Sequence, residues 1–287
     1  MTGKISFIFF LFIILFASCE KEVTLDFDHE SKLTFNCILN PDSIIHASLT
    51  QSQEIGGPGD FNAIKDAEIK LSEDDSIIGL LTDTGNGKYS IQYKPKPGKT
   101  YKVDIYKKNF PRAKATTTVP EGVKIEFIQK TPQPDEYKRH LVEVKINDRE
   151  GKNYYWYYSY TWRINYQDKL TSGYYNIYCP YFDDFNKKIE PEMKYGYYYD
   201  YMIRIKDSEN DGNILSWNTY ALKNDESDYY RVVLEVDKHY DKYLKTSVQM
   251  RMQENQTIAL NEPVSIYTNI ENGYGIFGAN LVTQKMY

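Results

Sequence analysis

The chain has 287 residues, with 35 lysines and arginines against 40 aspartates and glutamates, and a formal net charge of −5 at pH 7. Nucleic-acid binding requires clustered basic side chains, whereas the basic residues here occur only in short runs such as Lys107-Lys108 and Lys187-Lys188. The composition therefore argues against a nucleic-acid partner.

Residues 1–18 have the pattern of a bacterial lipoprotein signal peptide. Lys4 supplies a positive charge, residues 5–16 are apolar, and Ala17-Ser18 lead directly into Cys19. The apolar segment is shorter than the roughly 20 residues that a helix needs to cross a bilayer. We therefore predict that Cys19 is lipidated and that acyl chains hold the protein at the outer membrane. The alternatives are a secretory signal cut elsewhere and an uncleaved anchor helix.

Residues 19–30 are polar and acidic, which indicates a short tether. In Bacteroidetes lipoproteins, acidic residues directly after the lipidated cysteine resemble a signal for export to the outer face of the outer membrane. Glu20 and Glu22 fit that pattern and Lys21 does not. Surface exposure is the favoured expectation.

Two cysteines remain besides Cys19. An extracytoplasmic location would allow a disulfide between Cys37 and Cys179. Cys37, however, alternates with Phe35 and Leu39 on one face of a predicted strand, which favours a small core residue. Neither these cysteines nor the four histidines have metal-ligand spacing, so we predict no metal ligand and no cofactor.

The chain is predicted to be mainly β, because Gly, Asn and Asp interrupt short β-branched and aromatic runs almost throughout. Residues 31–120 are predicted to form an immunoglobulin-like or prealbumin-like β-sandwich. Its seven strands are expected near residues 32–39, 44–52, 67–73, 76–82, 87–93, 100–107 and 112–119.

Residues 121–287 are predicted to form a second, aromatic-rich β domain, beginning with strands near 123–130 and 140–148. Residues 154–162 and 195–201 place aromatic side chains on both faces of any strand they form, which is typical of a strand between two layers. Near the C-terminus the apolar period becomes helical, and we predict one helix near 238–254.

The aromatic segments are also candidate recognition surfaces, since flat rings stack on sugars and on peptide side chains. Trp156, Trp162 and Tyr199 are the candidate ligand-contact residues. Packing in the core is the alternative, and it is favoured for most of these aromatic side chains.

Residues 207–212 resemble the opening of a calcium-binding loop, with oxygen-bearing side chains at alternate positions and glycine at the sixth. The position of the closing glutamate is Asn218, so the match fails. A polar hairpin turn built on Asn210-Asp211-Gly212 is the favoured interpretation.

The chain contains neither a Gly-x-Ser-x-Gly nor a His-Glu-x-x-His motif. Carboxylate pairs for glycoside cleavage assemble only in the fold, so a sequence does not reveal them. We predict no catalytic residues and a protein that is not an enzyme.

Residues 261–279, with their Asn-Gly-Tyr-Gly-Ile-Phe-Gly-Ala ending, are similar to the signature of a Bacteroidetes lipoprotein family known as domain of unknown function 4249 (DUF4249). Further segments agree in order, namely Cys19–Val23, Ala67–Leu71, Gly87–Ser90, Pro97–Tyr101 and Thr116–Pro120. The glycine-rich residues 269–278 are expected to close the sandwich rather than to form a ligand loop.

The resemblance implies an outer-membrane accessory or substrate-binding lipoprotein that acts in nutrient uptake with a TonB-dependent transporter. The expected ligand is an unidentified peptide or glycan, or a metal-bearing nutrient. A structural or adhesive envelope protein is the alternative, and a glycan or peptide hydrolase is the least favoured.

Overall fold

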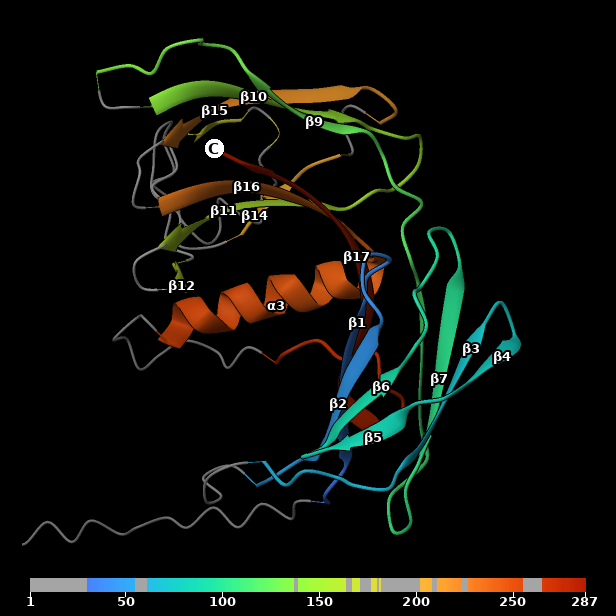
Figure 1. Cartoon of the computed structure of the whole chain (residues 1–287). Helices are drawn as coiled ribbons and strands as arrows, with labels where there is room; N and C mark the ends of the chain where they lie inside the picture. Colours follow the sequence, from blue (N-terminus) through green and yellow to red (C-terminus); the bar gives the residue numbers. More distant parts are fainter. Residues whose placement is uncertain are drawn as a thin grey trace, which may run out of the picture.

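The computed structural model describes residues 30–54, 61–136, 139–163, 167–170, 177–179, 181, 202–207, 211–222, 227–254 and 265–287. Within these segments the chain is mainly β, with several sheets and one helix near the C-terminus (Figure 1). This architecture confirms the fold class predicted from the sequence.

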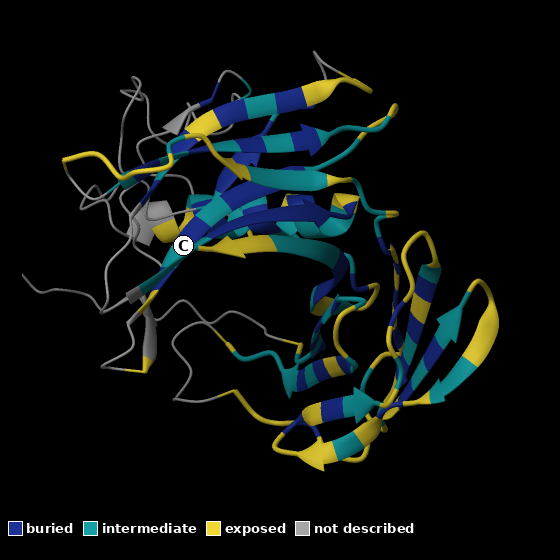
Figure 2. Cartoon of the chain, turned by 45° about the horizontal axis from the view of Figure 1, so that its top comes forward, coloured by how far each residue is buried: buried dark blue, intermediate teal, exposed yellow. Residues whose placement is uncertain are grey.

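The first unit is a β-sandwich. One sheet contains, in spatial order, β1 (Leu33–Leu39), β2 (Ile45–Gln51), β6 (Lys88–Ile91) and β5 (Thr82–Gly85). The facing sheet contains β4 (Ser76–Leu80), β3 (Glu68–Glu73), β7 (Thr100–Tyr106) and β8 (Ala113–Thr118). Buried and exposed residues alternate along several of these strands and appear as bands in Figure 2. The alternation places one apolar face of each sheet in a shared core.

All seven predicted strands of this unit are present, and β5 is an additional one. The sequence predicts a turn over residues 83–87. The structure confines the tight turn to Asn86 and Gly87, which have positive φ angles of 52° and 68°. Strand β5 therefore extends up to the turn and pairs with β6.

Both described cysteines are buried and free. Cys37 is 3% exposed and belongs to the sandwich core, which confirms the prediction from alternation. Burial removes water from the thiols and raises the pKa of Cys37 and of Cys179 to about 12. Both side chains therefore behave as small apolar groups rather than as nucleophiles.

The second unit has three layers. The outer sheet contains β13 (Ile177–Tyr178), β15 (Ile214–Leu222), β10 (Arg139–Asn147) and β9 (Ile125–Gln129). The middle layer contains β12 (Asp168–Leu170), β11 (Tyr155–Arg163) and β16 (Ser227–Val236), and β14 (Ile203–Ile205) also pairs with β11. The third layer is helix α3 (Lys238–Glu254), which lies along the other face of the middle sheet (Figure 1).

Strand β11 illustrates why aromatic residues occupy both of its faces. Tyr155 and Tyr157 pack between the two sheets. Trp156 points the opposite way and packs with Leu244 and Val248 of α3. Adjacent side chains of a strand point to opposite faces, so a strand between two apolar layers needs apolar residues at every position.

Helix α3 spans the residues predicted from the sequence. Asp237 precedes it and accepts hydrogen bonds from the backbone nitrogens of His239 (2.9 Å) and Tyr240 (3.1 Å), which caps the first turn. Asp241 in the first turn and Arg251 in the last turn match the helix dipole. In the described part of the chain, no helix combines the length and the apolar character needed to cross a membrane.

Strand β17 (Gly273–Met286) connects the two units. Its first half pairs in parallel with β1, from Gly273 opposite Leu33 to Ala279 opposite Leu39. Its second half pairs antiparallel with β16. One nine-stranded sheet therefore runs through both units, and the last strand contributes to the core of the first.

Candidate functional site

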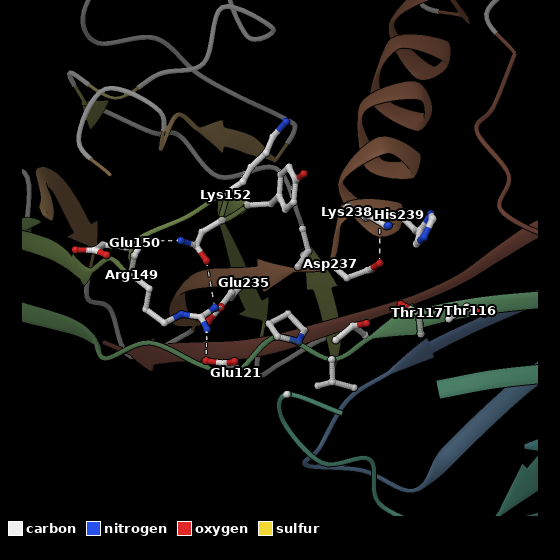
Figure 3. A pocket seen from close by; sticks show the side chains of 17 residues that line it. Thr116, Thr117, Glu121, Arg149, Glu150, Lys152, Glu235, Asp237, Lys238 and His239 are labelled. Atoms are coloured by element: carbon white, nitrogen blue, oxygen red, sulfur yellow. Dashed lines mark hydrogen bonds and ion pairs between the residues drawn. The ribbon is translucent and has the colours of Figure 1, made fainter. Parts of the chain in front are cut away.

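A cleft of about 480 Å³ lies where the sandwich meets the second unit (Figure 3). The sandwich contributes Gly98 and residues 116–121, at the end of β8 and beyond. The second unit contributes residues 149, 150 and 152–154, between β10 and β11, and residues 235–239, from the end of β16 to the start of α3. The cleft therefore exists only when three segments distant in the sequence have folded together.

Arg149 lies at the centre of one wall and links the two units. Its guanidinium donates hydrogen bonds to Glu121 Oε2 (2.7 Å), Glu235 Oε1 (2.6 Å) and Asn153 Oδ1 (3.1 Å). The Glu235 side chain is only 3% exposed. Burial raises the pKa of Glu235, and the adjacent Arg149 charge partly opposes that effect. This network fixes the wall geometrically and leaves Glu235 paired rather than free for proton transfer.

Asp237 is similarly occupied by structural contacts. Besides capping α3, its Oδ1 accepts a hydrogen bond from the backbone nitrogen of Ala279 in β17 (2.9 Å). Both carboxylate oxygens therefore face backbone donors, and the side chain is 93% buried, with an exposed fraction of 7%. A carboxylate held in this way positions the helix against β17 and is a poor general base.

His239 contributes a neutral ring to the cleft. Its Nδ1 lies 2.7 Å from the Tyr267 hydroxyl, and the two rings are stacked with centroids 6.1 Å apart. Burial lowers the pKa of His239 below its ordinary value, because the charged imidazolium loses water. At neutral pH the ring is therefore uncharged and can exchange hydrogen bonds with a ligand.

The exposed charges around the cleft have both signs. Glu121 and Glu150 are acidic, whereas Lys152 and Lys238 are basic, and all four are exposed. In Figure 3 Lys152 and Lys238 lie on the side of the cleft nearer α3, opposite Glu121. The arrangement suits a small ligand with both acidic and basic groups.

A second polar cluster lies behind the same wall. Asp148 follows β10, and Asp207 and Asp211 lie between β14 and β15. One carboxylate oxygen of each lies within 4.8 Å of those of the other two. Burial, followed by the adjacent Asp148 and Asp211 carboxylates, raises the pKa of Asp207 to about 6.

This raised pKa predicts an unusual pH dependence. In the unfolded chain Asp207 titrates near pH 3.9, so between about pH 4 and pH 6 the native state binds the extra proton. The contribution of Asp207 to stability is therefore fully present below about pH 4 and is lost as the pH rises through about 6. We therefore expect the melting temperature of Asp207→Asn, relative to that of the parent protein, to rise as the pH increases from 4 to 6. A chelator is included so that bound metal ions do not contribute to the difference. Thermal unfolding of both proteins from pH 4 to 7 tests this, and a pH-independent difference would contradict it.

The structure corrects the hairpin predicted at residues 207–212. Strand β14 pairs with β11 in the middle sheet, whereas β15 pairs with β10 in the outer sheet. The two strands that flank residues 207–212 therefore belong to different sheets and do not form one hairpin, and residues 208–210 lie outside the described part of the chain. Turn-forming residues specify that the chain changes direction, but they do not specify which strands pair afterwards.

The candidate ligand-contact residues have different positions. Trp156 has an exposed fraction of 0%, and its Nε1 donates to Asp241 Oδ1 at 3.0 Å, so it is a core residue and its assignment to a recognition surface is corrected. Trp162, near the end of β11, is 38% exposed. Tyr199 and Cys19 lie outside the described residues.

Partly buried tyrosines lie between these two tryptophans. The rings of Tyr160 and Tyr230 are stacked with centroids 4.5 Å apart, and Tyr158 lies 6.3 Å from Tyr160. Such stacked rings stabilise neighbouring strands. Sequence position alone does not distinguish this packing from a ligand surface.

Comparison with known proteins identifies the family. Residues 20–286 match the model of a family described as a domain of unknown function (DUF4249). The chain belongs to the DUF4249 family. The match spans nearly the whole sequence and confirms the resemblance seen in its motifs. No curated protein matches the chain.

The glycine-rich residues 269–278 of the family signature pack against both the sandwich and helix α3. Gly275 faces the backbone of β1, and Gly278 faces the Cβ of Tyr240 in α3, so a side chain at either position would collide with a neighbour. Phe277 lies in the sandwich core, with its ring 6.2 Å from that of Phe35. The expected closure of the sandwich is therefore confirmed.

The residues that line the cleft of this protein could not be identified from the sequence. Arg149, Glu121 and Glu235 belong to no motif, and they come from three segments that lie far apart in the sequence. Their one sequence signal is that Arg149 follows an aspartate just beyond a predicted strand, which is common at loop starts.

Proposed function

We propose that this protein is a lipid-anchored outer-membrane accessory protein that binds a small ligand and transfers it to a TonB-dependent transporter. Two features of the sequence support this function: the predicted lipidation at Cys19 and the DUF4249 resemblance. The observation that carries the proposal structurally is the cleft between the two units.

The volume of the cleft fits a small-molecule or short-peptide ligand. Ligand sites commonly enclose about 300–1,000 Å³ and combine apolar walls with a few fixed polar groups. The cleft of about 480 Å³ falls in this range, and Val119, Pro120 and Tyr154 supply its apolar surface. Arg149 and Asp237 fix the polar parts before any ligand arrives, which lowers the entropic cost of binding.

The chemistry of the cleft favours binding over catalysis. Glu235 is paired with Arg149, and Asp237 is occupied by backbone nitrogens. The residues that line the cleft include no serine and no cysteine. The exposed Glu121, Glu150, Lys152 and Lys238 around the cleft would bind the oppositely charged groups of a peptide.

The transporter partnership is tested by purifying the full-length lipidated protein from its native outer membrane in mild detergent. We expect a TonB-dependent transporter to co-purify in stoichiometric amount and to be identified by mass spectrometry. A Cys19→Ala variant, which cannot be acylated, is expected to lose the transporter. Recovery of the parent protein alone would contradict the proposal.

The same preparation tests the cleft. Small peptides released by denaturing the purified protein are expected to be depleted in a Lys152→Glu, Lys238→Glu double variant. A matched variant, Lys94→Glu, changes an exposed lysine outside the cleft and is expected to retain the peptides. Equal amounts of peptide from all three proteins would show that the cleft is not the binding site.

A further inference from the structure

The aspartate cluster behind the cleft wall has the composition of a cation site. Asp148, Asp207 and Asp211 each place a carboxylate oxygen within 4.8 Å of the others. They come from two separate connections, so folding has gathered three negative charges in one place. None of the ion pairs formed within the described ranges involves any of these three aspartates.

Asp207 provides an independent indication that the cluster binds a cation. Its exposed fraction is 7%, so the residue is more than nine-tenths buried. Oδ2 accepts a hydrogen bond from the backbone nitrogen of Asn153 at 2.8 Å, whereas Oδ1 is buried and has no hydrogen-bond partner. A buried carboxylate oxygen without a donor loses its hydration without compensation, which is costly unless a cation takes the place of water.

The other contacts of the cluster hold the carboxylates in place. Tyr155 donates its hydroxyl to Asp148 Oδ1 at 2.6 Å, and the backbone nitrogen of Gly212 donates to Asp148 Oδ2 at 3.2 Å. The backbone nitrogen of Gly151 donates to Asp211 Oδ1 at 2.7 Å. These neutral donors orient the three groups but do not neutralise their charges.

We propose that Asp148, Asp207 and Asp211 bind a calcium ion. Calcium prefers oxygen ligands at about 2.3–2.6 Å, so two ligands on opposite sides of the ion lie about 4.8 Å apart. No two of the three oxygens are more than 4.8 Å apart, so they lie close enough together to share one ion. Magnesium requires shorter bonds of about 2.1 Å in a strict octahedron and usually keeps several of its waters, so a cluster of protein carboxylates favours calcium.

The position of the ion gives it a role in shaping the ligand cleft. Residues 149–154 form one wall of the cleft, and Gly151 and Asn153 in this segment donate to Asp211 and Asp207. Calcium would therefore join the back of this wall to the connection between β14 and β15. Without the ion, repulsion among the aspartates would loosen the segment that positions Arg149.

Thermal unfolding of the full-length protein in detergent, after treatment with a chelator, tests the site. Saturating calcium chloride is expected to raise the melting temperature by about 5 °C, and magnesium chloride by much less. Asp207→Asn and Asp211→Asn are expected to reduce the calcium shift to about 1 °C or less. The matched variant Asp42→Asn, at an exposed turn, is expected to keep the full shift.

Terbium luminescence provides a readout that does not depend on stability. Because Tyr155 contacts Asp148, it is close enough to sensitise terbium bound at the cluster. We expect emission that calcium displaces and that Asp207→Asn and Tyr155→Phe both weaken. An equal calcium shift in the parent protein and Asp207→Asn, or a complete lack of calcium-displaceable emission, would overturn the proposal.

Discussion

Replacing Asp241 with alanine is expected to lower the free energy of unfolding by about 3–5 kcal/mol, because it removes one partner of a buried ion pair with Arg204. Asp241 Oδ1 accepts hydrogen bonds from Arg204 Nε at 2.6 Å and from Trp156 Nε1 at 3.0 Å. Arg204 also donates to Oδ2 at 3.2 Å. Asp241 is 3% exposed and Arg204 is 8% exposed, so water does not replace the lost contacts easily.

Urea unfolding followed by tyrosine and tryptophan fluorescence measures this effect. Asp241→Asn keeps an acceptor for Trp156 and removes the charge, so an intermediate loss is expected. Lys242→Ala, an exposed position on the same helix, controls for the change to alanine and should cost less than about 1 kcal/mol. If Asp241→Ala costs no more than Lys242→Ala, the ion pair does not hold α3 against the middle sheet.

The bounds of α3 were predictable because the signal is local. Tyr240, Leu244, Ser247 and Val248 repeat at helical spacing, and polar residues occupy the positions between them. The face against which the helix packs was not predictable. Trp156, against which the helix packs, lies far earlier in the chain. The aromatic residues around it indicate that both faces of the strand are buried, but they do not show which element covers each face.

The strands of the sandwich were predictable for a similar reason. Glycine, asparagine and proline mark the turns, and alternation in segments such as Leu33–Leu39 shows which face is buried. Pairing between strands depends on contacts across long stretches of chain, which no local pattern encodes. The parallel pairing of β1 with β17 joins the two ends of the described chain, and it emerges only from the structure.

The polar sites show the same limit. Asp207 and Asp211 are close in sequence and both fall in the calcium-loop pattern, but that pattern fails at Asn218. Asp148, the third member of the cluster, comes from a different connection between strands. A pattern confined to one loop therefore rejects a site whose ligands come from two loops.

Replacing Gly275 with alanine is expected to lower the free energy of unfolding by about 3 kcal/mol or more, or to prevent soluble folding. Gly275 has a φ of +98°, which a residue with a Cβ adopts only with strain. An added Cβ would also collide with the Phe35 carbonyl oxygen and would lie 2.8 Å from the Phe35 carbonyl carbon. Both Phe35 atoms belong to the backbone of β1, so relief requires the two strands to separate.

Gly85→Ala is a matched control for Gly275→Ala in urea unfolding. Gly85 has a φ of +96°, and an added Cβ would meet nothing within 4 Å, so this variant measures backbone strain without a collision. It is expected to cost about 1–2 kcal/mol. A larger loss in Gly275→Ala measures how strongly the fold depends on the close approach of β17 to β1. Equal losses would mean that the two strands can separate freely. In that case the glycine-rich signature would not be what closes the sandwich and joins it to the second unit.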